Sequence, residues 1–180
     1  ANAQDSLQEC YDTLMTGLKG AYGEPMIELI VSKVYPSESN YFGFEQLSDA
    51  SKPSEKETDV IKKYGAGSSK CERIRAGSMS IERQKMWLAA QNGALSALAQ
   101  LANGQISYGD YAVKLNNTAE QLYSDEDRMT QRHADKAKRD AEERRRAIDN
   151  MGNMIQDSMK SSTTNCTSSV VGDQVYTNCY

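Results

Sequence analysis

The feature that most constrains the fold is the stretch of residues 108–160, which contains no proline. Apolar residues recur every seven positions within it in two series, Tyr108, Leu115, Leu122 and Met129, then Ala134, Ala141, Ile148 and Ile155. A seven-residue apolar repeat is typical of helices that pack along their length, and an offset between two such series indicates a stutter. The sequence therefore predicts a single helix that, at 1.5 Å per residue, is about 80 Å long.

The second half of this predicted helix is dominated by charged residues. Acidic residues stand four positions before basic ones, as in Asp135–Arg139 and Asp140–Arg144, an orientation that supports helix formation. Because large apolar residues are scarce there, two interpretations remain open for residues 124–162. They form either a rod that packs on a partner, or a solvated single helix that links the preceding domain to the C-terminal segment. The contact face of such a rod would consist of Ile148, Met151 and Ile155.

Residues 1–123 read as a helical head domain. Ser6–Glu9 and Ser54–Glu57 each match a capping box, which marks the start of a helix. Glycine or proline separates the segments with helical periodicity, and Ser80 opens one that runs from Ile81 to Ala102. The residues of that segment expected to face the core are Ile81, Leu88, Leu95, Leu98 and Leu101.

Residues 163–180 predict a β-hairpin closed by a disulfide. Cys166 and Cys179 are symmetric about Gly172-Asp173, and glycine in the first turn position suits a type II′ turn. Counting outward from that turn places the two cysteines in a non-hydrogen-bonded pair, whose Cα atoms are within disulfide distance. The hairpin would fold back on its own domain or offer a strand edge to another chain. The residues expected to contact a partner are Val170, Val171, Val175 and Tyr176.

The fold class expected is therefore mainly α, a helical bundle with one long helix and a disulfide-closed hairpin. Cys10 and Cys71 each lie on an apolar helical face and are expected to pair, although two buried free thiols would fit the pattern too. A crosslink across this loop would stabilise the fold by about 4 kcal/mol. The chain has one histidine and no C-x-x-C, so disulfides are favoured over a metal site.

Disulfides and the first residues together indicate a periplasmic or extracellular location. The chain begins Ala1-Asn2-Ala3 without methionine, as after cleavage of a signal peptide. The net charge of −4 argues against nucleic acid as a partner. No apolar run approaches the roughly 20 residues that span a membrane.

No catalytic residue, metal site or cofactor is predicted. The only histidine, His133, stands among charged helical residues, and no phosphate-loop or zinc-protease motif is present. Met151, Met154 and Met159 could hold Cu(I), but methionine at helical spacing is more often packing. An enzyme is therefore the least favoured class.

Three segments carry a resemblance to a family. They are residues 44–55 with the following Cys71, residues 103–111, and the Thr- and Asn-rich tail with its two cysteines. The pattern resembles uncharacterised exported helical proteins of Gram-negative bacteria, over residues 10–122 and the tail. The resemblance implies a location in the cell envelope and brings no activity or functional residue.

Two functions follow as expectations. The first is a non-enzymatic exported structural or adaptor protein, which engages envelope proteins or a second copy of itself through the long helix and the hairpin. The alternative is a periplasmic small-molecule or cell-wall binding protein with an aromatic pocket near Trp87, to which Tyr41, Phe42 and Phe44 would contribute.

Overall fold

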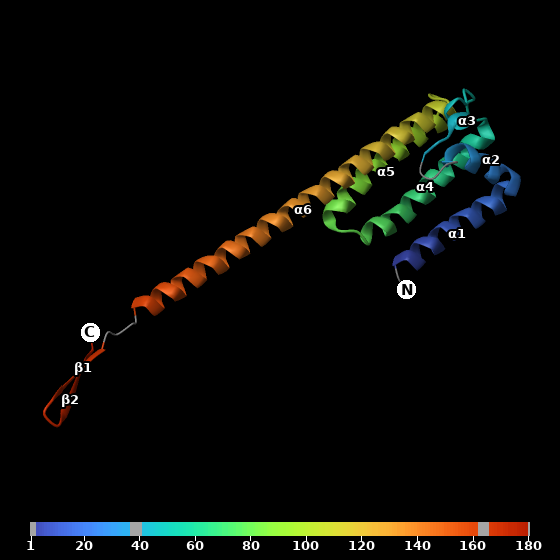
Figure 1. Ribbon diagram of the computed structural model, residues 1–180. Coiled ribbons are helices and arrows are strands. Elements are labelled where there is room, and N and C mark those ends of the chain that lie inside the picture. The colour runs from blue at the N-terminus through green and yellow to red at the C-terminus, as the bar shows by residue number, and fades with distance from the viewer. Residues whose placement is uncertain (1–2, 37–40, 162–165, 180) are drawn as a thin grey trace. The chain divides into compact units, whose positions relative to one another are not determined.

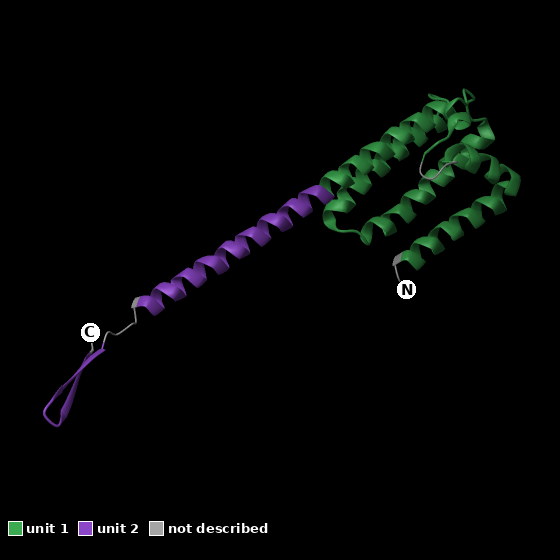
Figure 2. Cartoon of the chain, in the orientation of Figure 1, with its two compact units in different colours: residues 1–129 green, residues 130–180 purple. Residues whose placement is uncertain are grey.

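The computed structural model describes residues 3–36, 41–161 and 166–179, and they are mainly helical (Figure 1). The elements are α1 (Ala3–Tyr22), α2 (Glu24–Val34), α3 (Phe44–Leu47), α4 (Glu55–Gly77), α5 (Ile81–Ala102), α6 (Tyr108–Ser161), β1 (Cys166–Val171) and β2 (Gln174–Cys179). The mainly α fold, the long helix and the C-terminal hairpin that the sequence predicts are thereby confirmed. The chain divides into two compact units, residues 1–129 and residues 130–180 (Figure 2).

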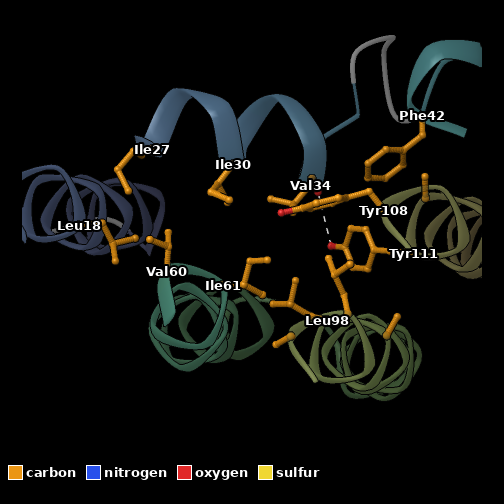
Figure 3. Packing of buried hydrophobic residues seen from close by; sticks show 14 residues of the cluster. Leu18, Ile27, Ile30, Val34, Phe42, Val60, Ile61, Leu98, Tyr108 and Tyr111 are labelled. Carbon is orange, nitrogen blue, oxygen red and sulfur yellow. Dashed lines mark hydrogen bonds between the residues drawn. The ribbon is translucent and has the colours of Figure 1, made fainter. Parts of the chain in front are cut away.

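The first unit is a helical head whose core lies between α1, α2, α4, α5 and the first turns of α6. Figure 3 shows Ile27, Val60 and Ile61 converging in this core, and each is at most 2% exposed. Tyr108 and Ala112, from the first turns of α6, are equally buried. Removing this apolar surface from water supplies most of the free energy that holds the helices together.

The expected inner face of α5 is only partly correct. Leu98 and Leu101 are buried, whereas Leu88 is 36% exposed and Ile81 is 74% exposed, so their assignment to the core is wrong. The fully buried residues of α5 all belong to its last turns, beginning with Ala97. The first turns of α5 still contact other helices, through the Arg83–Glu126 ion pair with α6 and the Trp87–Glu72 hydrogen bond with α4, but Ile81 and Leu88 do not face the core.

Helix starts follow the capping residues closely, with one exception. Ser54 accepts a hydrogen bond from the Glu57 amide at 3.3 Å, and the Glu57 carboxylate accepts one from the Ser54 amide at 2.7 Å, which confirms this capping box. Ser80 likewise caps α5. Ser6, however, lies inside α1, so the capping box expected there is wrong. α1 begins at Ala3, three positions before Ser6.

Two glycines in the middle of α4 permit close helix packing. A Cβ at Gly67 would lie 2.2 Å from Cδ1 of Leu14, and one at Gly65 would lie 2.9 Å from Cδ2 of Leu98. α4 nevertheless continues through both positions as one helix. These glycines bring α1 and α5 close to α4, which offsets the cost of about 1 kcal/mol that glycine carries inside a helix.

A disulfide joins α1 to α4 within the head. Cys10 and Cys71 are bonded with a Cα–Cα distance of 5.6 Å, and Cys71 is fully buried. The bond links segments 61 residues apart in the sequence, as the pairing of two apolar faces predicts.

The first turn of α6 is anchored on the loop that precedes α4. The Tyr108 amide donates to the Ser51 carbonyl at 3.0 Å, and the Gly109 amide donates to the Asp49 carbonyl at 2.7 Å. A Cβ at Gly109 would lie 2.6 Å from the Leu47 carbonyl oxygen, so only glycine allows this approach. The start of the long helix is thus part of the head.

The second unit contains the remaining part of α6 and the hairpin. Strands β1 and β2 pair antiparallel in the predicted register, with Cys166 opposite Cys179 and Val171 opposite Gln174. Gly172 has φ +66°, as the predicted tight turn requires. Cys166 is disulfide-bonded. The side chain of Cys179 lies outside the described residues, so the pairing of these two sulfur atoms stays a prediction.

Candidate functional site

A cavity of about 460 Å³ opens between the helices of the head. Every helix of the head except the short α3 contributes to its wall, and most of the large side chains are aromatic. Its aromatic lining residues are Tyr11, Tyr35, Phe42, Tyr64, Trp87 and Tyr111. A cavity of this size and lining has the character of a small-molecule site.

A buried carboxylate, that of Glu72, lies in the wall of the cavity. It is 5% exposed and accepts hydrogen bonds from the Tyr11 hydroxyl at 2.5 Å and from the Trp87 indole nitrogen at 2.9 Å. The Arg75 guanidinium lies 3.4 Å from the same carboxylate and stacks over the Trp87 ring at 5.1 Å. Buried charges are stable only when paired and hydrogen-bonded, and these three partners meet that requirement.

Tyrosines form the second polar component of the cavity. The hydroxyls of Tyr35 and Tyr64 are hydrogen-bonded to each other, and their rings meet edge to face at 5.6 Å. Burial raises the pKa of Tyr64 far above its usual value, and it raises the pKa of Tyr11 in the same direction with help from the Glu72 carboxylate. These hydroxyls are therefore neutral hydrogen-bonding groups across the physiological range.

The charged groups of the cavity wall are engaged with one another. Among the described residues that line it, the charged ones are Glu72 and Arg75, and each is engaged by the other and by Trp87. Gln91 also lines the cavity and offers an amide that can bond to a ligand. Flat aromatic faces next to amide and hydroxyl groups suit a sugar ring or another partly apolar molecule.

The aromatic residues that the sequence grouped together are separated in the structure. Trp87 and Phe42 line the cavity, and Phe42 packs edge to face on Tyr111 at 5.9 Å. Tyr41 is 37% exposed and lies 6.2 Å from the Tyr123 ring instead. Phe44 begins α3 and is 84% exposed. Neither belongs to the cavity wall.

Sequence reasoning missed the residues that give this cavity its polar character. Tyr64, Ser68, Glu72 and Arg75 follow one another at spacings of four, four and three along α4, and all line the cavity. This polar stripe beside an apolar face was a usable signal. Tyr11 and Glu72 directly follow Cys10 and Cys71, so the predicted disulfide was itself a signal that these two side chains lie close together.

The second unit presents a different kind of surface. Every side chain of residues 130–160 is exposed, including those of the predicted contact face. Ile148, Met151 and Ile155 are 67%, 60% and 56% exposed, and Met154 and Met159 on neighbouring turns are more than 65% exposed. His133 is exposed on the same helix.

The hairpin exposes its apolar side chains as well. Alternation along the strands puts Val170 and Val175 on one face and Val171 and Tyr176 on the other, and all four are 55–70% exposed. Within the described residues, each strand pairs only with the other, so both outer edges carry free backbone groups. The hairpin thus offers edges as well as side chains.

Two further observations concern the described residues as a whole. None of their helices is long and apolar enough to cross a membrane. They contain no group of three or more His, Cys, Asp or Glu side chains placed to hold a metal ion.

Comparisons with known protein families, with curated proteins and with solved structures found no match.

Proposed function

We propose that this chain is a non-enzymatic, exported structural or adaptor protein that engages protein partners in the cell envelope through the last turns of α6 and through the hairpin. The observation that carries the proposal is the exposure of Ile148, Met151 and Ile155 on one face of α6. Apolar surface costs about 25 cal/mol per Å² when it stays in water, and contiguous apolar patches commonly mark interaction sites.

The contrast with the head strengthens this interpretation. The head buries one cluster of large apolar residues, among them Ile27, Ile61 and Leu101, whereas residues 130–160 bury none of theirs. The face of α6 that carries Ile148 repeats at seven-residue intervals, which is the pattern a helix uses to pack on another helix.

The hairpin supplies a second, smaller contact. Its unpaired edges can add to a strand of another protein, with Val170 or Val171 entering side-chain pockets of that partner. An isolated two-stranded hairpin is marginally stable in water, and either a disulfide or a partner removes that weakness.

The expected compartment rests on cysteine chemistry. The Cys10–Cys71 bond joins two helices of the head, and Cys166 is also disulfide-bonded. Such bonds persist in oxidising compartments, which supports a periplasmic or extracellular location.

The test is affinity capture from the native envelope under non-reducing conditions, with mass spectrometry of whatever co-purifies in stoichiometric amount. Two changed chains are compared with the original, one lacking residues 163–180 and one carrying Ile148→Lys and Ile155→Lys. A matched control carries Asn150→Lys and Asn153→Lys, which add the same charge on other faces of the helix.

We expect the original chain and the control to retain an identified protein partner, and the two changed chains to lose it. All chains should keep the head folded, as circular dichroism would show. An unchanged set of co-purifying proteins in both changed chains would contradict the proposal.

The cavity supports a second candidate function, the binding of a small molecule with a flat, partly apolar face, such as a sugar ring of the cell wall. The chain contains a single tryptophan, Trp87, which lines the cavity, so its fluorescence reports directly on occupancy. Titration with N-acetylglucosamine oligomers should shift the Trp87 emission in the original chain and not after Gln91→Leu. A flat titration would reject saccharides as the ligand class.

A further inference from the structure

The exposed face of α6 has the heptad pattern of a two-stranded coiled coil. If Ala134 is assigned to heptad position a, the other a positions are Ala141, Ile148 and Ile155, and Met151 occupies a d position. Isoleucine at a favours two strands in parallel coiled coils when d carries leucine, and here the unbranched, apolar Met151 takes that position. All of these side chains are exposed in the single chain, so each lacks the neighbouring helix that the pattern requires.

We propose that residues 134–160 of α6 pair with the same segment of a second copy of this chain, as a parallel two-stranded coiled coil in register. This inference rests on the proposed function, since it names the partner that covers the Ile148 face. The copies then stack Ile148 on Ile148, Met151 on Met151 and Ile155 on Ile155. Each contact removes apolar surface of both copies from water.

The flanking positions support a second copy as the occupant. In a parallel dimer, position g of one helix faces position e of the following heptad of the other helix. Asp140 at g then faces Arg145 at e, and Met154 at g faces Met159 at e. Side chains of opposite charge thus face each other in the charged half of the segment, and apolar side chains face each other in the other half.

The Asp140–Arg145 pair between copies replaces no ion pair that the described residues form within one chain. Among the ion pairs of the described residues, none involves either side chain. Both side chains are exposed, so each pair contributes little to affinity and acts mainly on register and orientation.

An antiparallel pairing fits the same residues less well. An antiparallel register that stacks Ile148 on Met151 of the other copy also places Arg144 against Ile155. Asp140 then loses its basic partner. The parallel arrangement keeps aliphatic side chains together at every position where they occur.

Arg144 is the one core position that opposes association. It occupies position d, where two copies bring like charges together, and its Nε donates to the Asp140 carbonyl of its own helix at 3.1 Å. A charged core residue weakens a coiled coil while it fixes the register. Arg144→Leu should therefore tighten the dimer, lowering its dissociation constant on the order of tenfold or more.

The experiment is the molar mass of the purified full-length, oxidised chain by light scattering and sedimentation equilibrium. We expect twice the monomer mass of 19.9 kDa for the original chain, for Arg144→Leu and for the Asn150→Lys and Asn153→Lys control. The chain with Ile148→Lys and Ile155→Lys should have the monomer mass. A monomeric original chain, or a dimer that survives the two core lysines, would overturn the inference.

Orientation is tested by single cysteines introduced into the full chain and oxidised in a glutathione redox buffer. Ile148→Cys should form a crosslink between identical positions of two copies, and Asn153→Cys at the outer position f should not. Crosslinking of Ile148→Cys only to Met151→Cys in a mixture would overturn the parallel arrangement.

Failure of this inference can be told apart from failure of the proposed function. A monomeric chain that still captures an envelope protein through Ile148 and Ile155 contradicts the dimer and supports the adaptor function. A dimer that captures the same proteins with and without residues 163–180 supports the coiled coil and leaves the hairpin without a role in capture.

Discussion

The part of α6 in the head and the part beyond residue 129 have the same kind of apolar repeat, but they differ in whether their apolar side chains are buried. Tyr108, which begins the first seven-residue series, is 1% exposed in the head, whereas Ile148 and Ile155 of the second series are 67% and 56% exposed. A heptad repeat therefore specifies that a helix packs on something. It does not specify whether that partner belongs to the same chain.

Polar groups follow the same division. In the head, the carboxylate of Glu72 is buried and held by Tyr11 and Trp87, so its hydrogen bonds contribute to one fixed arrangement. Along residues 130–160 the charges are solvated and exposed. Exposed charges contribute little to stability, so the head should carry nearly all the tertiary stability of an isolated chain.

The largest effect should follow from opening the disulfide of the head. Replacing Cys10 and Cys71 by alanine removes a crosslink between positions 61 residues apart. By the chain-entropy relation the head should lose about 4 kcal/mol of unfolding free energy. Urea unfolding followed by Trp87 fluorescence measures this loss. Replacing Cys166 and Cys179 by serine is the control, and an equal loss there would break the contrast between the two regions.

A glycine in each region gives a matched pair within α6. Gly109→Ala places a Cβ 2.6 Å from the Leu47 carbonyl oxygen, and this overpacking should cost the head about 1–3 kcal/mol. Gly152→Ala meets nothing within 4 Å and should increase helix stability by about 0.5–1 kcal/mol. Thermal unfolding by circular dichroism compares the two. A stabilising Gly109→Ala would show that the first turn of α6 is not anchored on the loop.

Removing one of the groups that donate a hydrogen bond to the Glu72 carboxylate should lower the unfolding free energy by a similar or somewhat smaller amount. Trp87→Phe keeps an aromatic ring but leaves one carboxylate oxygen without its 2.9 Å bond, at a cost of about 1–3 kcal/mol. Tyr176→Phe removes the exposed hydroxyl bond to Gln174 and should change stability by less than about 0.5 kcal/mol. Urea unfolding followed by circular dichroism is suitable, since Trp87→Phe removes the only tryptophan.

The smallest expected effect is the pH dependence that Glu57 gives to the unfolding free energy of the head. Burial raises the pKa of Glu57, but the hydrogen bonds from Ser54 and the charge of Lys33 outweigh burial and hold that pKa below its usual 4.5. A carboxyl with a lowered pKa stabilises the fold above its unfolded pKa and loses that contribution as pH falls through its folded pKa. The head should therefore weaken as pH falls below about 4.5.

Glu57→Gln is the variant that isolates this contribution. Its unfolding free energy should be lower than that of the original chain near neutral pH, and the difference should shrink toward acid pH. Unfolding curves collected at several pH values measure the difference. A constant difference at all pH values would mean that the Glu57 charge makes no contribution.

Local signals account for most of what was predicted correctly. Ser54 and Ser80 start helices because their side chains satisfy backbone amides only three positions away. The register of the hairpin follows from the symmetry of Cys166 and Cys179 about a two-residue turn. Interactions between residues a few positions apart can be predicted from the sequence, because they depend little on the rest of the fold.

Contacts between distant segments account for the errors and omissions. Ile81 belongs to the apolar periodicity of α5 but is 74% exposed, although the Arg83 side chain two positions later pairs with Glu126 of α6 at 2.9 Å. The cavity was expected near Trp87, but its polar wall depends on Tyr11 and Glu72 meeting across two helices. Periodicity gives the face of a helix and not the extent to which neighbours cover it.

The sequence by itself thus determined the starts of α4 and α5, the long α6 and the hairpin, because each depends on neighbouring residues. Only the tertiary structure decided which apolar faces are buried, where the cavity lies and which residues line it. The division between the two regions shows why. Tyr108 and Ile148 occupy equivalent places in two similar repeats, and only the three-dimensional arrangement of the other helices buries one and leaves the other exposed.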